Sequence, residues 1–167
     1  MKHLLAAIDK ISDRVGKSAS WLIFPLIVVM VLSTIMRYGF NRSPIWAYDM
    51  TWMLFAALFL LGGAYCFLHE GHVRVDLFSE RLAPRARSIL EVVTYLIFFF
   101  PLFYVLSVYV TRYAYNSWIS HEVSPCTSWA VPLGPIKTVM VIGFLLLTLE
   151  GISKFIKHLS AAVKKEN

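Results

Sequence analysis

Charged residues are scarce in this sequence. Only 16% of its 167 residues are charged and 58% are hydrophobic, whereas a soluble domain has about a quarter charged and about half apolar residues. The missing charge leaves three uncharged runs, residues 18–36, 50–68 and 92–111, which contain 19, 19 and 20 residues. Each run is long enough to cross a hydrocarbon layer about 30 Å thick as a helix. This composition excludes a soluble enzyme, a disordered chain and a secreted disulfide scaffold.

Cysteine is nearly absent too. Cys66 and Cys126 are expected near opposite sides of the membrane, whereas a disulfide needs Cα atoms within about 7 Å, so the two cannot pair within one chain. His69, Glu70 and His72 do not have the spacing of a zinc motif, and no nucleophile elbow, phosphate loop or carboxylate pair occurs. We therefore expect no metal, no cofactor, no catalytic or substrate-binding residue and no enzymatic activity.

A fourth hydrophobic segment is less clear than the first three. The uncharged run 138–149 has 12 residues, and a helix of 21 residues results only if three residues are added before it and six after it. Lys137 can extend outward from one end, and Lys154 follows Glu150 at the helical spacing of an ion pair. The sequence thus predicts an all-α integral membrane protein with one domain over 1–167 and four transmembrane helices, near 19–38, 44–68, 88–113 and 135–156.

The distribution of basic residues decides between four spans and three. With four spans and the N-terminus inside, 12 basic residues fall in inner segments and 4 in outer segments (Arg37, Arg42, Arg112 and Lys137), as the positive-inside rule requires. Three spans would place the basic C-terminal tail outside. We therefore expect both termini to be cytoplasmic. Nucleic-acid binding would need one continuous basic surface, and here the positive charge is divided among three segments, so no nucleic-acid partner is expected.

Residues 3–17 are too polar to span a membrane, yet they are patterned. Leu4, Ile8, Ile11 and Val15 fall on a helical stripe about 60° wide, and charged residues fill the opposite side. This pattern predicts an amphipathic interfacial helix on the inner leaflet, with its lysines near anionic lipid headgroups. A frayed cytoplasmic tail is the alternative.

Asp49 is the most informative single residue. A helix that begins at Pro44 places Asp49 about 7–8 Å below its start, where a carboxylate is costly unless it is paired or hydrated. Arg37 and Arg42 are the local candidates for its partner. One interpretation is an ion-coupling or proton-relay group, and the other is a buried ion pair that fixes the hairpin or contacts another subunit. The structural interpretation is favoured because no second acid lies nearby in any span.

The interior of the predicted spans argues against transport by this chain alone. The middle of every span consists of Leu, Ile, Val, Phe and Ala, which cannot coordinate an ion or an organic anion. All five histidines lie in tails or loops, so a haem-binding bundle is also excluded. Gly62, Gly63 and Ala64 are instead small residues that let another helix approach closely. The chain is expected to support chemistry carried out by another protein.

Short motifs follow one another between Trp21 and Phe155: Trp46 with Asp49, Gly62-Gly63-Ala64, His72-Val73-Arg74-Val75-Asp76, Leu82-Ala83-Pro84-Arg85, Pro132, and Ile142-Gly143-Phe144-Leu145-Leu146. In this order they resemble the small membrane subunit of tripartite ATP-independent periplasmic (TRAP) transporters, the DctQ-like family. The resemblance covers nearly the whole chain and agrees with its length and span count. Where the family often has glutamate, this chain has Asp49.

The resemblance implies a function that depends on partners in the bacterial inner membrane. In such transporters a large membrane subunit holds the substrate and sodium sites. A periplasmic binding protein delivers the substrate, usually an organic acid such as a dicarboxylate or a sialic acid. The small subunit extends the fixed scaffold and helps to receive the binding protein. A stand-alone four-helix carrier or sensor is the competing class.

These considerations give three groups of candidate residues. Assembly and ion pairing are assigned to Asp49, Arg37, Trp46, His72, Arg74 and Asp76. Helix packing is assigned to Gly62, Gly63, Ala64 and Gly143. Reversible docking favours polar rims and aromatic anchors, so the outer face is represented by Arg42, Trp118, His121 and Glu122. The expected partners are the large membrane subunit, the binding protein and membrane lipids.

Overall fold

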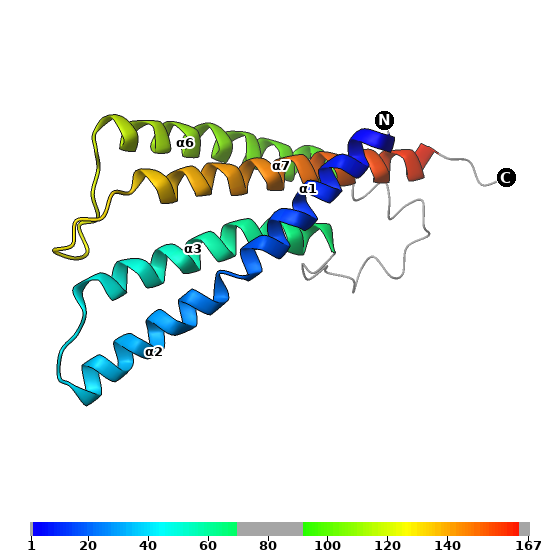
Figure 1. Cartoon of the computed structure of the whole chain (residues 1–167). Coiled ribbons are helices and arrows are strands. Elements are labelled where there is room, and N and C mark those ends of the chain that lie inside the picture. The colour runs from blue at the N-terminus through cyan, green and yellow to red at the C-terminus, as the bar shows by residue number, and fades with distance from the viewer. Residues whose placement is uncertain (1, 70–91, 164–167) are drawn as a thin grey trace.

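A computed structural model of the chain describes residues 2–69 and 92–163, and its elements there are all helical. In chain order these elements are α1 (Lys2–Ser20), α2 (Ile23–Gly39), α3 (Ile45–Leu68), the π-helix η1 (Tyr95–Phe99), α6 (Phe100–Ile119) and α7 (Gly134–Val163). Figure 1 shows the α2–α3 turn and the α6–α7 loop at one end of the bundle, hereafter the loop end. The start of α1 and the end of α7 lie at the other end.

Four helical segments are long and apolar enough to cross a membrane: Leu5–Gly39, Ile45–Leu68, Val92–Ile119 and Gly134–Lys157. The prediction of an all-α protein with four such helices is confirmed for the described residues. The bounds differ in places. Trp21 and Leu22 form a turn between α1 and α2, so α2 begins at Ile23, whereas the predicted first span begins at residue 19. The last two spans continue beyond the predicted ends at residues 113 and 156.

α1 lies across α3 and also contacts α7 (Figure 1). Its buried side carries small residues, namely Ser12, Gly16 and Ala19. A side chain at Gly16 would collide with Tyr65 of α3, so only glycine permits this close crossing. Ile11, from the predicted apolar stripe, is 53% exposed. The bundle therefore takes up the small-residue side of α1 and leaves part of its apolar stripe on the outside.

Aromatic packing joins the third span to its neighbours. The ring of Phe99 stacks on Phe67 of α3 at a centroid distance of 5.7 Å and on Phe103 at 4.2 Å. Phe155 of α7 contacts Phe100 edge-to-face at 5.2 Å. The π-helical turn precedes Pro101, which has no N–H to complete an α-helical ladder, and this accounts for the local widening.

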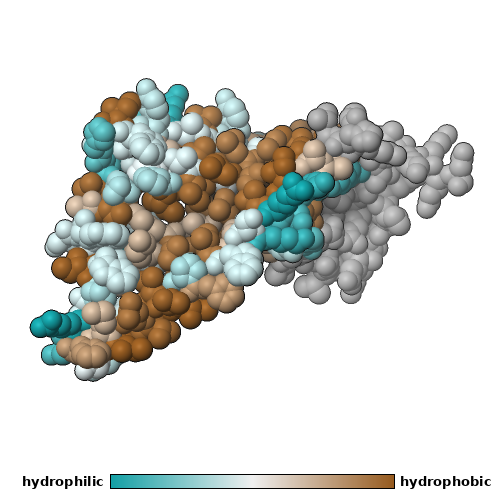
Figure 2. Space-filling view, in the orientation of Figure 1, coloured by the Kyte–Doolittle hydropathy of each residue, from teal (hydrophilic) through white to brown (hydrophobic). Residues whose placement is uncertain are grey.

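The surface of the bundle is largely apolar between its ends. Figure 2 shows brown apolar residues over α2 and over much of α6 and α7, while hydrophilic residues gather at the loop end and along α1. Large exposed hydrophobic side chains include Phe59 at 71%, Phe98 at 70% and Val105 at 63%. Such faces suit a hydrocarbon environment or another membrane helix, so the chain is a multi-pass membrane protein.

Candidate functional site: a polar network at the loop end

The main polar network is centred on Asp49, in the second turn of α3. The side chain is fully buried. One carboxylate oxygen accepts hydrogen bonds from Ser124 Oγ at 2.7 Å and from Trp52 Nε1 at 3.0 Å. The other oxygen accepts a hydrogen bond from Thr127 Oγ1. Two of these donors belong to the α6–α7 loop, so Asp49 attaches that loop to α3.

Backbone hydrogen bonds within the α6–α7 loop place Ser124 and Thr127 beside Asp49. Ser124 N–H donates to the Val131 carbonyl at 2.8 Å, and Leu133 N–H donates to the Glu122 carbonyl at 2.9 Å, so the loop folds back on itself. His121 and Ala130 have positive φ values of 48° and 50° at its two bends. The position of Asp49 near the N-terminus of α3 also favours a negative charge, because the helix dipole is positive there.

The predicted pairing of Asp49 with one of its two local candidates, Arg37 or Arg42, is not what the structure shows. Arg37 donates to Ser43 Oγ at 3.3 Å, and both oxygens of Asp49 are occupied by neutral donors. The reason is the return of the α6–α7 loop, whose hydroxyl groups approach Asp49 from a part of the chain more than 70 residues away. Among these partners only Trp52, three residues after Asp49 on the same helix face, has a local sequence signal.

Glu122 and Lys137 form a second attachment at the loop end. Lys137 lies in the first turns of α7 and is only 5% exposed. Its ammonium pairs with the Glu122 carboxylate and lies 3.5 Å from the centroid of the Tyr113 ring. The hydrogen bond from Lys137 lowers the pKa of Glu122. Glu122 is therefore held within the chain, which leaves it poorly suited to contact an incoming protein.

The other residues predicted for the outer face differ in their exposure and in their contacts within the chain. Trp118 is 55% exposed, but its Nε1 donates to Thr138 Oγ1 at 2.9 Å and its ring lies against Gly134. Arg42 and His121 are exposed on the two loop-end turns, and Trp46 is half-buried at the start of α3. The structure thus leaves Arg42 and His121 as the accessible polar residues of this set. His72, Arg74 and Asp76 lie outside the described residues.

Comparison with protein families identifies the chain. The family model for tripartite ATP-independent periplasmic transporters, DctQ component, matches residues 26–161 of the 167. The chain belongs to the DctQ family. A search of curated proteins gives no significant match. The DctQ match begins within α2 and extends through most of α7, so it includes the whole Asp49 network.

The small residues of this DctQ chain occupy different environments. A Cβ added at Gly143 would lie 3.0 Å from both the Cβ and the carbonyl oxygen of Leu60, so α3 and α7 are in close backbone contact there. Ala64 is fully buried. A Cβ added at Gly63 would lie 3.7 Å from Leu147 Cδ1, which is an ordinary van der Waals contact. A Cβ added at Gly62 would meet no atom of the described residues within 4 Å, so this glycine faces open space.

A second polar cluster holds α1 at the opposite end of the DctQ bundle. Asp9 of α1 pairs with Lys157 of α7 at 2.8 Å and accepts a hydrogen bond from Ser153 at 3.0 Å. Glu150 is fully buried, and among the described residues neither of its carboxylate oxygens has a hydrogen-bond partner. The expected Glu150–Lys154 ion pair does not form, and the Lys154 ammonium lies 4.8 Å from the centroid of the Phe67 ring.

Groups suited to redox or metal chemistry are scattered in the described part of the chain. No three His, Cys, Asp or Glu side chains gather there into a potential metal site. Cys66 and Cys126 are both free thiols, the first partly buried in α3 and the second exposed in the α6–α7 loop. The polar networks at the two ends consist of hydrogen bonds and ion pairs between helices and loops.

Acid should weaken the Glu122–Lys137 attachment. Because the pKa of Glu122 is lowered in the folded protein, its contribution to stability is present above the ordinary glutamate pKa and is lost as the pH falls through the lowered value. We expect the melting temperature of the wild type to exceed that of Glu122→Gln by a few degrees at pH 6. This difference should shrink as the pH falls below the ordinary glutamate pKa of about 4.3, and it should disappear once the pH is below the lowered pKa of Glu122. Melting curves in detergent across this range provide the test, and a constant difference would contradict the assignment.

Proposed function

We propose that this chain is a scaffold subunit of a TRAP transporter in the bacterial inner membrane. It binds the large membrane subunit, which carries out sodium-coupled uptake of an organic acid of the dicarboxylate or sialic acid type. It also helps to receive the periplasmic substrate-binding protein. The observation that carries this proposal is the separation of polar and apolar groups, because the buried polar networks attach loops and helix ends to the bundle while the faces between them are apolar.

An exposed stripe on α3 offers a surface for the large subunit. Phe55 and Phe59 are 57% and 71% exposed, and their rings stack at a centroid distance of 6.3 Å. Gly62 follows at helical spacing on the same face, and a Cβ added there would meet no atom of the described residues within 4 Å. The two aromatic rings offer a large contact area, and the neighbouring glycine lets the backbone of another membrane helix approach closely. We call these three residues the α3 stripe.

Reconstitution tests the scaffold assignment directly. Proteoliposomes that contain the large subunit and this chain are expected to take up substrate when the binding protein and a sodium gradient are supplied. Vesicles prepared with the large subunit alone should lose most of this uptake, because the scaffold and the docking surface are incomplete. Full uptake by the large subunit alone would contradict the proposed function.

Arg42 provides a specific test of docking. It is exposed on the α2–α3 turn, whereas Glu122 is paired with Lys137. Charge at the rim of an interface acts mainly on the rate of encounter. We expect Arg42→Glu to raise the binding-protein concentration for half-maximal uptake about three- to tenfold at low salt, with a smaller increase at high salt. Both membrane subunits should still purify together.

Lys10→Glu is the matched control for Arg42→Glu, because Lys10 is an exposed cation on α1 at the opposite end of the bundle. Its titration curve should match that of the wild type. If the curve for Arg42→Glu also matches at both salt concentrations, docking does not involve this turn and belongs to the large subunit.

A further inference from the structure

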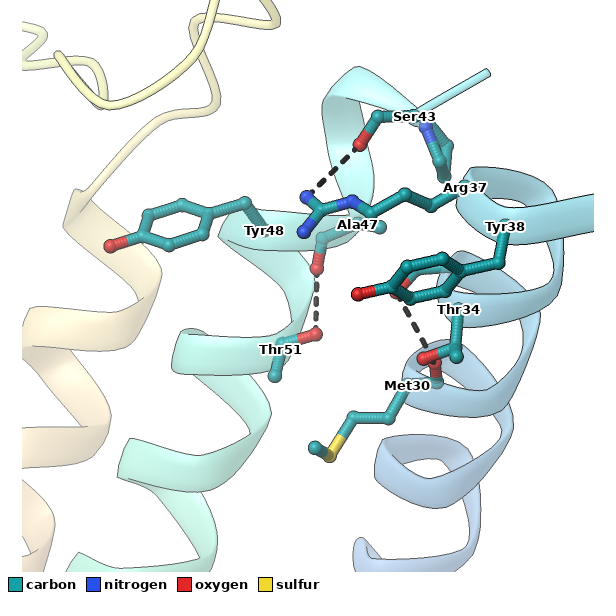
Figure 3. Close-up of a pocket in the computed structure, with 10 residues that line it drawn as sticks. Met30, Thr34, Arg37, Tyr38, Ser43, Ala47, Tyr48 and Thr51 are labelled. Atoms are coloured by element: carbon teal, nitrogen blue, oxygen red, sulfur yellow. Dashed lines mark hydrogen bonds between the residues drawn. The ribbon is translucent and has the colours of Figure 1, made fainter. Parts of the chain in front are cut away.

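A cleft between α2 and α3 lies outside the Asp49 and Glu122–Lys137 contacts described above. Its volume is about 310 Å³, and it lies at the loop end of the bundle. Arg37 lines it together with hydroxyl-bearing residues from both helices and the turn, namely Ser33, Thr34, Tyr38, Ser43, Tyr48 and Thr51. Figure 3 shows the Arg37 guanidinium reaching from α2 toward Ser43 and Ala47, at the beginning of α3.

The cleft is rich in hydrogen-bond donors. A guanidinium carries five N–H donors, and within the described ranges Arg37 makes one side-chain hydrogen bond, to Ser43 Oγ at 3.3 Å, and no ion pair. Because Ser43 accepts this bond, its own hydroxyl proton is available to a further acceptor. Thr34 and Thr51, in contrast, donate to the carbonyls of Met30 and Ala47. A cation with spare donors and no acidic partner in the cleft indicates a site for an anion.

The position of the cleft selects the kind of anion. Arg37 lies two residues before the end of α2, about 3 Å of helix rise from the point where this span is expected to leave the hydrocarbon layer. An arginine near the end of a transmembrane helix extends toward the headgroup region, where lipid phosphates are abundant. Arginine binds phosphate through two parallel N–H bonds. Further down the cleft Met30 is 51% exposed, and Ile27, one turn earlier on α2, is 50% exposed, so the adjoining surface suits an acyl chain.

We propose that this cleft binds a membrane phospholipid from the leaflet at the loop end. Arg37 and Ser43 donate hydrogen bonds to the phosphodiester, and one acyl chain lies against Met30 and Ile27. Among the described helices, α2 makes extensive contacts only with α3. The lipid therefore completes the packing of the helix that is least surrounded by protein.

Native mass spectrometry of the purified full chain tests this site. The chain is titrated in detergent with palmitoyl-oleoyl phosphatidylglycerol, and the affinity of the most tightly bound lipid is measured. We expect Arg37→Gln to weaken this lipid about tenfold and Arg37→Lys to weaken it less, because lysine retains the charge but lacks the planar fork. Thr34→Phe fills the cleft while leaving Arg37 in place, and it should weaken the lipid as strongly as Arg37→Gln.

Arg112→Gln is the matched control, because Arg112 is an exposed arginine on α6 near the same end of the bundle and outside the cleft. Its lipid affinity should equal that of the wild type, and each variant should melt within a few degrees of the wild type. Equal weakening by Arg37→Gln and Arg112→Gln would overturn the proposal, as would wild-type binding by Thr34→Phe. Displacement of the lipid by an equal concentration of sn-glycerol 3-phosphate would also overturn it. In the assembled transporter, a photo-crosslinker at Thr51 should capture lipid, and capture of the large subunit instead would contradict a lipid occupant.

Discussion

Asp49→Ala should cause the largest loss of stability among the polar substitutions, with a melting temperature roughly 5–10 °C below that of the wild type. The substitution leaves Trp52, Ser124 and Thr127 without their common acceptor. Ser124 is buried and the other two donors are half-buried, and donors removed from water are costly to leave without a charged partner. Because two of the three donors are in the α6–α7 loop, the loop should also detach from α3. Hydrogen exchange of residues 120–133 is expected to become faster, while exchange within α1 stays unchanged.

Two further variants make the Asp49 prediction specific. Asp49→Asn keeps the shape and one acceptor oxygen, so it should fall between Asp49→Ala and the wild type. Asp13→Asn is the control, because Asp13 is an acid of α1 at the other end of the bundle, where its contacts with Lys17 at 2.7 Å and with His69 at 3.3 Å are partly exposed to solvent. It should change the melting temperature by no more than a degree or two. Wild-type stability and loop exchange in Asp49→Ala would contradict the anchoring role.

The same variants separate the two interpretations of Asp49 that the sequence leaves open. A structural anchor predicts that Asp49→Asn reduces recovery of the assembled transporter but leaves the number of sodium ions per substrate unchanged. An ion-coupling group predicts normal assembly with altered stoichiometry. The network of neutral donors around the carboxylate supports the structural interpretation, because a group that exchanges ions during transport would need access that this buried side chain does not have.

The fold was predictable to the extent that it depends on hydropathy. Uncharged runs and the distribution of basic residues are sufficient for four spans, because both reflect the cost of charge in hydrocarbon. The start of the first span was harder to predict from the sequence. Ser18, Ala19 and Ser20 belong to the uncharged run, yet in the structure they complete α1, and the turn comes only at Trp21 and Leu22. Ala19 is buried against the bundle, so tertiary packing sets this boundary.

The partners of the polar residues were harder to predict for a related reason. Spacing along one helix identifies neighbours three or four residues apart, which is why Trp52 could have been assigned to Asp49. Ser124 and Thr127 reach Asp49 because the loop folds back over α3, and nothing in their local sequence specifies that approach. The same loop brings Glu122 to Lys137, fifteen residues further along the chain. Long-range polar contacts of this kind depend on the tertiary fold and become visible only in the structure.

Of the three glycines assigned to helix packing, Gly143 should be the most damaging to replace with leucine. A Cβ alone would lie 3.0 Å from the Cβ and the carbonyl oxygen of Leu60, and the remaining leucine atoms would have to displace the α3 backbone. Overpacking of this kind costs about 1–3 kcal/mol when the neighbours can adjust and more when they cannot. We expect the melting temperature of the isolated chain in detergent to fall by roughly 5–10 °C. Gly143→Ala should produce a smaller decrease, and an unchanged melting temperature for Gly143→Leu would contradict the close contact of α3 with α7.

Gly62→Leu makes the same substitution at a glycine of α3 that is not in close contact with another helix of the described residues. Among the described residues, nothing lies within 4 Å of a Cβ at Gly62, and replacing a helical glycine gains up to about 1 kcal/mol in helix propensity. The isolated chain should therefore be as stable as the wild type or slightly more stable. If the α3 stripe contacts the large subunit, the added side chain fills the hollow beside Phe59 and recovery of the assembled transporter should fall severalfold. Normal recovery of the assembled transporter with Gly62→Leu would show that the α3 stripe faces lipid. The contact with the large subunit would then be expected on α6, where Leu102 and Val105 are also exposed.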